Sequence, residues 1–230
     1  MTVPTTPGGS PGRTLAVVSA GLSQPSSTRL LADRLADATV RELEDAGHTV
    51  RVETIELRDL AHAVVDAMLT RFPSGDLPRA LESVTGADGL IAVTPVFTTG
   101  YSGLFKSFWD VVDPDALTGT PVLLGATGGT ARHSLALEYT MRPLFTYLRA
   151  DVVPTSVYAA TDDWAASADP STLRQAQPGA GSGQRDGGGL PRRIARAGRE
   201  LARRVAVREN DGPADPFAAT PSFTELLGGS

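Results

Sequence analysis

The sequence contains no cysteine among its 230 residues. This absence excludes disulfide bonds, thiolate nucleophiles and cysteine-ligated metal or iron–sulfur sites. Histidine is also scarce, and the three that occur, His48, His62 and His133, are too widely spaced to match a metal-ligand motif. We therefore expect no metal site.

Long apolar runs are absent as well, since none approaches the roughly 20 residues that cross a bilayer. Residues 1–13, MTVPTTPGGSPGR, have neither the basic nor the apolar region of a secretory signal, and they are expected to form a disordered leader. The net charge of −5 disfavours a general nucleic-acid-binding role. These features predict a cytoplasmic protein that binds neither membrane nor nucleic acid.

What the sequence does contain is a regular alternation of apolar strands and amphipathic helices. Apolar or alternating segments predict five strands, at 14–20, 49–57, 89–96, 121–127 and 152–160. Helical patterns lie between them, at 28–46, 60–72, 78–88, 102–112 and in a stripe of Leu137, Met141, Leu144 and Leu148. The alternation predicts an α/β fold, a flavodoxin-like doubly wound five-stranded parallel sheet in a three-layer αβα sandwich.

Prolines and glycines refine this prediction. Pro143 falls within the last helical stripe and should kink it, and Pro154 indicates that the fifth strand lies at an edge of the sheet. Gly47 stands where a residue terminating the helix 28–46 belongs.

After the fifth strand the composition changes. A Gly-rich stretch at 176–189 is expected to be a flexible insertion, and residues 191–207 form a helix with six arginines. A basic helix is compatible with membrane or nucleic-acid binding, but its apolar stripe favours the closing helix of a domain at 14–207. The tail, 208–230, is expected to be flexible. Its apolar residues, Phe217, Phe223, Leu226 and Leu227, offer a segment that docks on a partner subunit.

In a doubly wound sheet, ligands bind at the carboxyl ends of the strands. This rule selects the loops 19–28, 94–104 and 127–133. The first loop contains neither the GKS/GKT of a nucleotide-binding P-loop nor the GxGxxG of a dinucleotide fingerprint. It contains five hydroxyl residues before a helix, Ser19, Ser23, Ser26, Ser27 and Thr28. Capping by Ser26 or Ser27 needs only one of them, so a phosphate site at the helix N-terminus is favoured.

The other two loops contain glycines that allow a planar ligand to approach the backbone. In the second loop these are Gly100 and Gly103, with Phe97 and Tyr101 able to flank the ligand. A loop packed on its own aromatic side chains is an equal alternative there, and Lys106 is expected to be a surface or interface charge. The third loop, ATGGTARHS at 126–134, offers two glycines and then Arg132 and His133. Arg132 is able to neutralise an anionic oxygen of a ligand, whereas His133 is as compatible with an ordinary helix start as with a catalytic role.

None of the three loops pairs a nucleophile with a base, which disfavours a hydrolase. A phosphorylated planar cofactor that supplies its own redox chemistry fits them better.

Together the three loops resemble those of NAD(P)H-dependent FMN reductases of the flavodoxin-like superfamily. The similarity is strongest to the reductase components of alkanesulfonate and luciferase-like two-component monooxygenases. It spans about residues 14–160. Its most specific parts are TPVFTTGYSGLFKSFWDVV, like the family's flavin-ring loop, and PVLLGATGGTARHSLALEYTMRPLF, like its ATGG segment. SAGLSQPSSTRLLADRL is similar to the family's phosphate loop.

The resemblance implies FMN as the flavin and NADPH or NADH as the hydride donor, with hydride passing from nicotinamide C4 to flavin N5. No side chain is then needed as a catalytic acid or base, while backbone N–H groups from Gly128 to Thr130, with Arg132, would support negative charge near flavin N1. The implied cofactor-binding residues are Ser19, Gly21, Ser23, Ser26, Ser27, Thr28, Pro95, Val96, Phe97, Thr98, Gly100, Tyr101, Ser102, Gly103, Thr127, Gly128, Gly129, Thr130 and Arg132.

Three positions depart from the family pattern. Ser23 stands where many members have arginine, Phe97 where tyrosine is usual, and Gly100 where serine is usual.

The resemblance further implies a homodimer or homotetramer that uses the helices near 102–112 and 133–149, and a partner flavin-dependent monooxygenase that receives the reduced flavin. Three alternatives remain open at this stage. They are a quinone or azo-dye reductase that keeps its FMN bound, a non-enzymatic flavodoxin-like electron carrier, and a flavin-free binding or scaffold protein.

Overall fold

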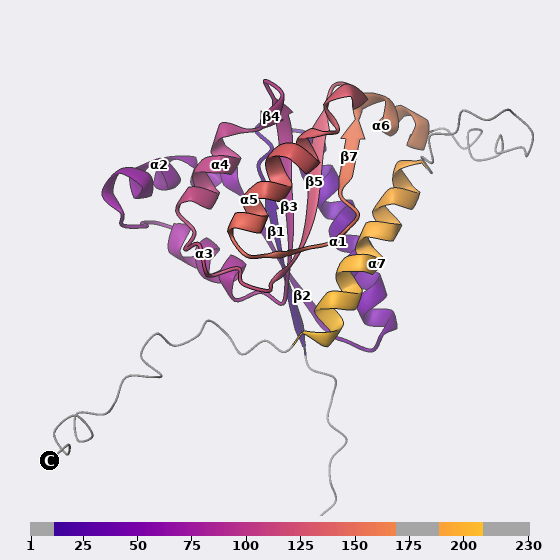
Figure 1. The fold of residues 1–230 in the computed structure, drawn as a ribbon, viewed down its shortest axis with the longest axis horizontal. Coiled ribbons are helices and arrows are strands. Elements are labelled where there is room, and N and C mark those ends of the chain that lie inside the picture. The colour runs from indigo at the N-terminus through magenta and orange to yellow at the C-terminus, as the bar shows by residue number, and fades with distance from the viewer. Residues whose placement is uncertain (1–11, 169–188, 209–230) are drawn as a thin grey trace, which may run out of the picture.

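The structure, a computed structural model, describes residues 12–168 and 189–208. At its centre is a sheet in the order β2-β1-β3-β5, with both β6 and β7 paired to β5, and all of these pairings are parallel. The strands are β1 (Arg13–Ser19), β2 (Val50–Glu56), β3 (Gly89–Phe97), β5 (Pro121–Gly128), β6 (Asp151–Val152) and β7 (Val157–Ala160). This order confirms the predicted flavodoxin-like sheet (Figure 1).

Helices cover both faces of this sheet (Figure 1). On one face a buried apolar cluster joins the sheet to α1 (Ser27–Asp45) and α7 (Leu190–Val207). On the other face a second cluster joins it to the remaining helices. These include η1 (Leu57–Leu60), α2 (Ala61–Thr70), α3 (Leu77–Thr85), α4 (Gly103–Asp110), the π-helix η3 (Leu137–Met141) and α5 (Arg142–Tyr147). The three-layer αβα sandwich is therefore confirmed.

The helix with six arginines serves as a closing helix. Ile194, Leu201 and Val205 of α7 are buried against the sheet and α1, while most of the arginines face solvent. The predicted insertion at 176–189 lies outside the described residues except for its last glycine. The tail with Phe217, Phe223, Leu226 and Leu227 lies outside them too.

The start of the folded chain differs slightly from the predicted boundary. β1 begins at Arg13, one residue inside the expected leader. The Arg13 guanidinium lies 3.2 Å from the Asp88 carboxylate, and the other carboxylate oxygen of Asp88 accepts from the Thr14 N–H at 2.7 Å. In the described part of the chain, no helix is long and apolar enough to span a bilayer.

The predicted helix around Pro143 is divided into a π-helix and an α-helix. Pro143 lies in the first turn of α5, directly after η3. Because proline has no N–H to donate to the preceding turn, a wider π turn before it replaces the regular α-helical ladder. Leu137, Met141 and Leu148 are buried as predicted, and Leu144 is partly buried.

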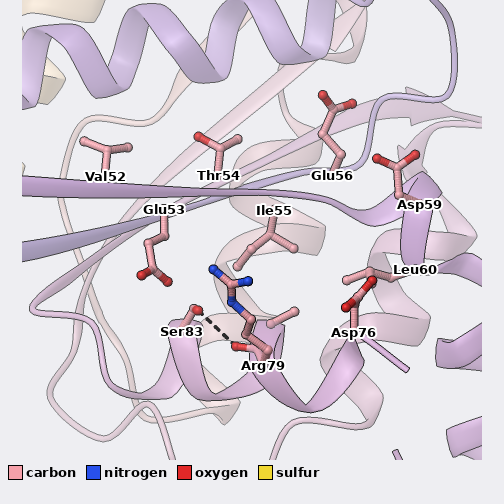
Figure 2. Close-up of a pocket in the computed structure, with 11 residues that line it drawn as sticks. Val52, Glu53, Thr54, Ile55, Glu56, Asp59, Leu60, Asp76, Arg79 and Ser83 are labelled. Atoms are coloured by element: carbon pink, nitrogen blue, oxygen red, sulfur yellow. Dashed lines mark hydrogen bonds between the residues drawn. The ribbon is translucent and has the colours of Figure 1, made fainter. Parts of the chain in front are cut away.

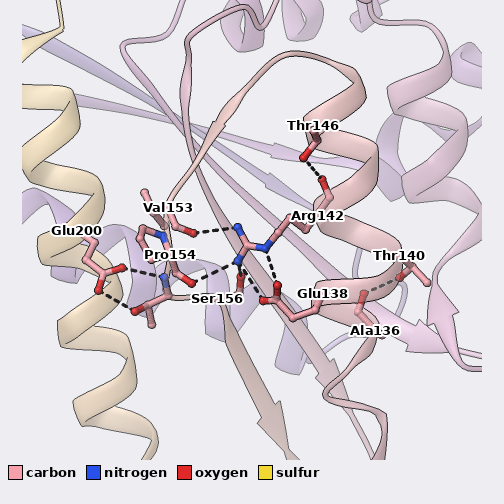
Figure 3. Close-up of polar contacts among 10 residues, drawn as sticks. Ala136, Glu138, Thr140, Arg142, Thr146, Val153, Pro154, Ser156 and Glu200 are labelled. Atoms are coloured by element: carbon pink, nitrogen blue, oxygen red, sulfur yellow. Dashed lines mark hydrogen bonds and ion pairs between the residues drawn. The ribbon is translucent and has the colours of Figure 1, made fainter.

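The predicted fifth strand is also divided, because β6 and β7 flank residues 153–156. Pro154 cannot donate to a sheet ladder, and side chains from two helices bind this connection instead (Figure 3). Arg142 pairs with Glu138 at 2.6 Å and donates to the Pro154 carbonyl at 3.3 Å. From α7, the Glu200 carboxylate accepts from the N–H and the hydroxyl of Thr155, each at 2.8 Å. These contacts fix the start of β7.

Both carboxylates of this network titrate below their ordinary range. The hydrogen bond from Arg142 lowers the pKa of Glu138. Burial alone would raise the pKa of Glu200, but hydrogen bonds from Thr155 and Arg196 outweigh burial and lower the pKa. A carboxylate with a lowered folded-state pKa stabilises the fold above its ordinary pKa of about 4.3, and this stabilisation is lost as the pH falls through the folded-state pKa.

We therefore expect acid to destabilise the wild-type protein partly through Glu200. Between about pH 5 and pH 3 the thermal unfolding midpoint of the wild type should fall more steeply than that of Glu200→Gln. Glu44→Gln, which changes an exposed carboxylate of α1, should follow the wild-type curve. Parallel curves for Glu200→Gln and the wild type would contradict this expectation.

Candidate functional site

The carboxyl ends of β1, β3, β5 and β7 meet at one edge of the sheet, and the residues that follow them enclose a cavity of about 480 Å³. It is lined by Leu22, Ser23, Ser27, Thr28, Pro95, Val96, Phe97, Thr127, Gly128, Gly129, Ala159, Thr161 and Trp164. All three loops selected from the sequence contribute to it. The other residues of the predicted set lie outside this lining, namely Ser19, Gly21, Ser26, Thr98, Gly100, Tyr101, Ser102, Gly103, Thr130 and Arg132.

The five hydroxyl residues of the first loop have different roles. The Ser26 side chain caps α1, accepting from the Arg29 N–H at 3.2 Å. Ser23, Ser27 and Thr28 line the cavity. Ser19 is 1% exposed at the end of β1, and its hydroxyl has no hydrogen-bond partner among the described residues. One hydroxyl therefore caps the helix, as the capping interpretation predicts, and three other hydroxyl residues line the cavity, where the phosphate site stays a prediction.

The N-terminus of α1 provides a positive environment without a free cation. The unpaired N–H groups at this helix end carry a partial positive charge. The first turn contains no acidic residue, so no carboxylate there offsets this charge. Arg29 lies in that turn, but its guanidinium pairs with Asp33 at 2.7 Å and with Glu56 at 2.6 Å. The hydrogen bond that Arg29 donates to Asp33 is the main reason why the Arg29 pKa is raised. An anion at this end would be held by N–H groups and hydroxyls.

The second loop contains a tight hairpin, which the sequence did not predict. The short strand β4 (Gly100–Tyr101) pairs antiparallel with the end of β3, which leaves Thr98 and Thr99 as the two turn residues. Both have positive φ, 48° and 73°, the pattern of a type I′ turn that usually contains asparagine or glycine. Pro95, Val96 and Phe97 reach the cavity, and Phe97 is 47% exposed.

The end of this loop supports the fold. Ser102 is buried and caps α4, accepting from the Phe105 N–H at 3.2 Å. The Tyr101 ring packs against Phe105 with 5.9 Å between centroids. Lys106 pairs with Asp110 one turn along α4, as expected for a surface charge.

The third loop is joined to the first by a buried contact. The hydroxyls of Thr28 and Thr127 lie 2.8 Å apart, 99 residues apart in the chain. The next residue, Gly128, lies so close to Tyr158 that a Cβ there would be 2.1 Å from the phenol oxygen. That oxygen donates to the Thr130 carbonyl at 3.0 Å. Burial is the main cause of the raised pKa of Tyr158, so the phenol stays a hydrogen-bond donor.

Arg132 lies on the short turn η2 (Ala131–His133), where its side chain is exposed. A Cβ at Gly129 would meet nothing within 4 Å, so the backbone of this residue is open to the cavity.

Sequence reasoning missed four cavity residues. Leu22 lies in the first loop, and Ala159, Thr161 and Trp164 lie at the end of β7 and in the first turn of α6 (Thr161–Ala168). The sequence could have indicated the residues after β7, because ligands bind at the carboxyl ends of the strands and this rule also applies to the fifth predicted strand.

A second hollow of similar size, about 490 Å³, lies between β2 and α3 (Figure 2). Glu53, Glu56, Asp59 and Asp76 contribute four carboxylates to its lining, against the single guanidinium of Arg79. Three of these carboxylates pair with arginines, Glu53 with Arg51, Glu56 with Arg29 and Asp59 with Arg58. The lining still carries more acidic than basic side chains and contains no glycine, so it suits a phosphorylated planar ligand less well than the cavity at the strand ends. The cavity at the strand ends is therefore the candidate site.

Comparison with known proteins agrees with this geometry. A family model described as NADPH-dependent FMN reductase matches residues 13–165. The chain belongs to the NADPH-dependent FMN reductase family. It is an NAD(P)H:flavin oxidoreductase that uses FMN and NAD(P)H, which confirms the resemblance found in the sequence.

Individual FMN reductases show the same relationship. An FMN reductase (NADPH) of Pseudomonas aeruginosa is 36% identical over 149 residues, which cover 64% of this chain and 76% of that protein. The NADH-dependent FMN reductase SfnF of Pseudomonas fluorescens is 38% identical over 149 residues, again 64% and 76%. Among solved structures, an oxidoreductase of Corynebacterium diphtheriae has a TM-score of 0.75 and 43% identity, covering 86% of this chain and 99% of that one.

Proposed function

We propose that the cavity at the strand ends is the FMN site of this reductase. The phosphate lies against the N-terminus of α1 with Ser23, Ser27 and Thr28, and the flavin ring lies between the hairpin with Phe97 and the glycines at 128–129. One observation carries this proposal: a single cavity combines a helix N-terminus rich in hydroxyls with apolar and glycine surfaces suited to a planar ring. FMN has a phosphate at one end, which suits the helix N-terminus, and a planar flavin ring at the other, which suits the apolar and glycine surfaces.

When bound, FMN supplies the hydride-accepting ring, so the protein needs no acid or base of its own. The chain contributes binding and orientation. The α1 N–H groups and nearby hydroxyls hold the phosphate, the Thr28–Thr127 contact fixes the distance between the phosphate loop and the glycine segment, and Gly129 leaves backbone open toward the ring.

We further propose that reduced flavin leaves the protein and is passed to a partner flavin-dependent monooxygenase. This finer function rests on the resemblance to reductase components of two-component systems. It is supported by the exposure of Phe97, 47%, which leaves the ring end of the cavity open to solvent.

Homodimerisation through the region of α4, η3 and α5 is part of the same proposal. Two large side chains there are strongly exposed, Tyr139 at 75% and Tyr147 at 72%, beside a hollow of about 710 Å³ that they line with Tyr101 and Pro143. Contiguous exposed apolar surface of this kind is typical of protein interfaces. The mass in solution, measured by light scattering, tests it: a monomer would contradict the proposal.

The activity is tested by following NADPH and NADH oxidation by flavin-stripped protein while FMN is varied. Saturating dependence on FMN, unchanged by added quinone or azo dye, supports a reductase that releases reduced flavin. Oxidation that requires the quinone or dye identifies a reductase with bound FMN, and no oxidation at any FMN concentration identifies an electron carrier.

The site is tested with the double variant Thr28→Val/Thr127→Val. Replacing both hydroxyls by methyl groups of the same shape leaves neither one unpaired, so the fold should lose little stability. If the Thr28 hydroxyl also binds the FMN phosphate, the Kd should rise about tenfold, because a hydrogen bond to a charged group is lost. An unchanged Kd measured by calorimetry would show that the pair serves only the fold.

A further inference from the structure

Trp164 is a cavity residue that the sequence comparison with the family did not assign. It lies in the first turn of α6, which follows the edge strand β7, and it lines the same cavity as Ser23, Ser27 and Thr28. The indole is partly buried and packs against the apolar cluster that includes α1 and α7. It therefore approaches the cavity from the α1 side, where we place the phosphate.

Two contacts fix the position of this tryptophan. The guanidinium carbon of Arg34, two turns along α1 from Ser27, lies 4.9 Å from the centroid of the Trp164 ring. The neighbouring Asp163 holds the start of α6, accepting from the Ala160 N–H at 2.9 Å and pairing with Arg193 at 2.5 Å. The indole is thus held between a fixed helix start and a cation.

Arg34 differs from the other arginine near this end of α1. Arg29 is neutralised by Asp33 and Glu56. Within residues 12–168 and 189–208, no ion pair joins Arg34 to a carboxylate, and its contact is with the Trp164 ring. Among the described residues its positive charge is therefore not paired with a carboxylate, and it lies against Trp164, which lines the cavity.

We propose that Trp164 contacts bound FMN at the phosphate end of the cavity, and that Arg34 is a positioning residue whose charge also favours the phosphorylated flavin. The proposal rests on the placement of FMN given above. A cation stacked on the indole holds the ring in place. Arg34 lies two turns along α1 and does not line the cavity, so its charge acts on the phosphate at a distance, on the side where Ser23 offers only a hydroxyl.

The test compares the dissociation constants of FMN and riboflavin, because only FMN has the phosphate. Arg34→Met keeps the aliphatic stem and removes the charge. It should weaken FMN binding about threefold to tenfold and leave riboflavin binding within about twofold. Arg34→Lys keeps the charge and should retain most of the preference for FMN. Arg203→Met removes an exposed charge on α7 and serves as the matched control.

Trp164 is tested with Trp164→Leu and Trp164→Phe. Trp164→Leu should weaken binding of both flavins about tenfold. Trp164→Phe keeps an aromatic ring for Arg34, so it should recover most of that loss, and it keeps the test valid if the leucine variant unfolds.

In steady state, Arg34→Met should raise the KM for FMN with kcat unchanged, since it removes binding common to ground and transition states. If Arg34 had a purely structural role, Arg34→Met would shift the unfolding midpoint without altering the ratio of FMN to riboflavin affinity.

The outcomes separate this inference from the placement of the site. If Thr28→Val/Thr127→Val weakens FMN binding while Arg34→Met behaves like Arg203→Met, or Trp164→Leu folds and binds both flavins normally, the site stands and the inference fails. If the threonine double variant and Gly128→Ala, which obstructs the same cavity, both bind FMN normally, the site itself is misplaced.

Discussion

Replacing Gly198 by valine is expected to lower the free energy of unfolding by about 3 kcal/mol. Gly198 is buried where α7 crosses α1, and a Cβ there would lie 2.8 Å from the Ala38 Cβ, 2.9 Å from the Ala38 carbonyl carbon and 3.0 Å from the Thr39 nitrogen. Two of these atoms are backbone and have no rotamer to change. The helices must therefore separate, which loosens the apolar contacts of both.

The measurement is urea unfolding followed by circular dichroism. Arg203→Val places the same β-branched residue at an exposed position of the same helix, so it reports the helix-propensity cost alone, about 0.5 kcal/mol. If Gly198→Val loses no more stability than Arg203→Val, the close approach of the two helices is not essential to the fold.

The architecture was predictable because its determinants are local. Strand and helix patterns follow from the spacing of apolar residues, and the switch-point rule then places the site at the strand ends. The cavity lies there and includes residues of all three predicted loops. Local rules failed where side chains from distant segments decide the outcome. The split of the fifth strand at Pro154 depends on Arg142 and Glu200, which lie on two different helices.

The roles of individual site residues were harder to predict. Five hydroxyls in one loop look alike in sequence, but only the three-dimensional arrangement shows that Ser26 caps α1 and that Thr28 bonds to Thr127. Ser102 resembled a cofactor contact and is instead a buried helix cap. Trp164 was missed for a different reason. It follows the last predicted strand, at 152–160, and the loop after that strand was not among the candidate loops.

Gly128→Ala is the substitution we expect to damage the proposed flavin site most. Its Cβ would lie 2.1 Å from the Tyr158 hydroxyl and 3.2 Å from the adjacent ring carbon. Tyr158 is only 4% exposed, and its hydroxyl is bonded to the Thr130 carbonyl, so the ring has no free space to move into. The segment from Gly128 to Thr130 must shift instead, and a displacement of about 1 Å in a binding segment costs on the order of 100-fold in rate when it disturbs alignment.

We expect kcat/KM for FMN to fall by about tenfold to 100-fold in Gly128→Ala, measured as NADPH oxidation with FMN varied. Tyr158→Phe alone removes the hydroxyl and its hydrogen bond without a clash, and it should cost about threefold or less. The double variant Gly128→Ala/Tyr158→Phe removes the closest clash and should recover part of the loss. If the double variant is no better than Gly128→Ala, pressure on Tyr158 is not the cause, and the alanine methyl group itself must obstruct the ligand.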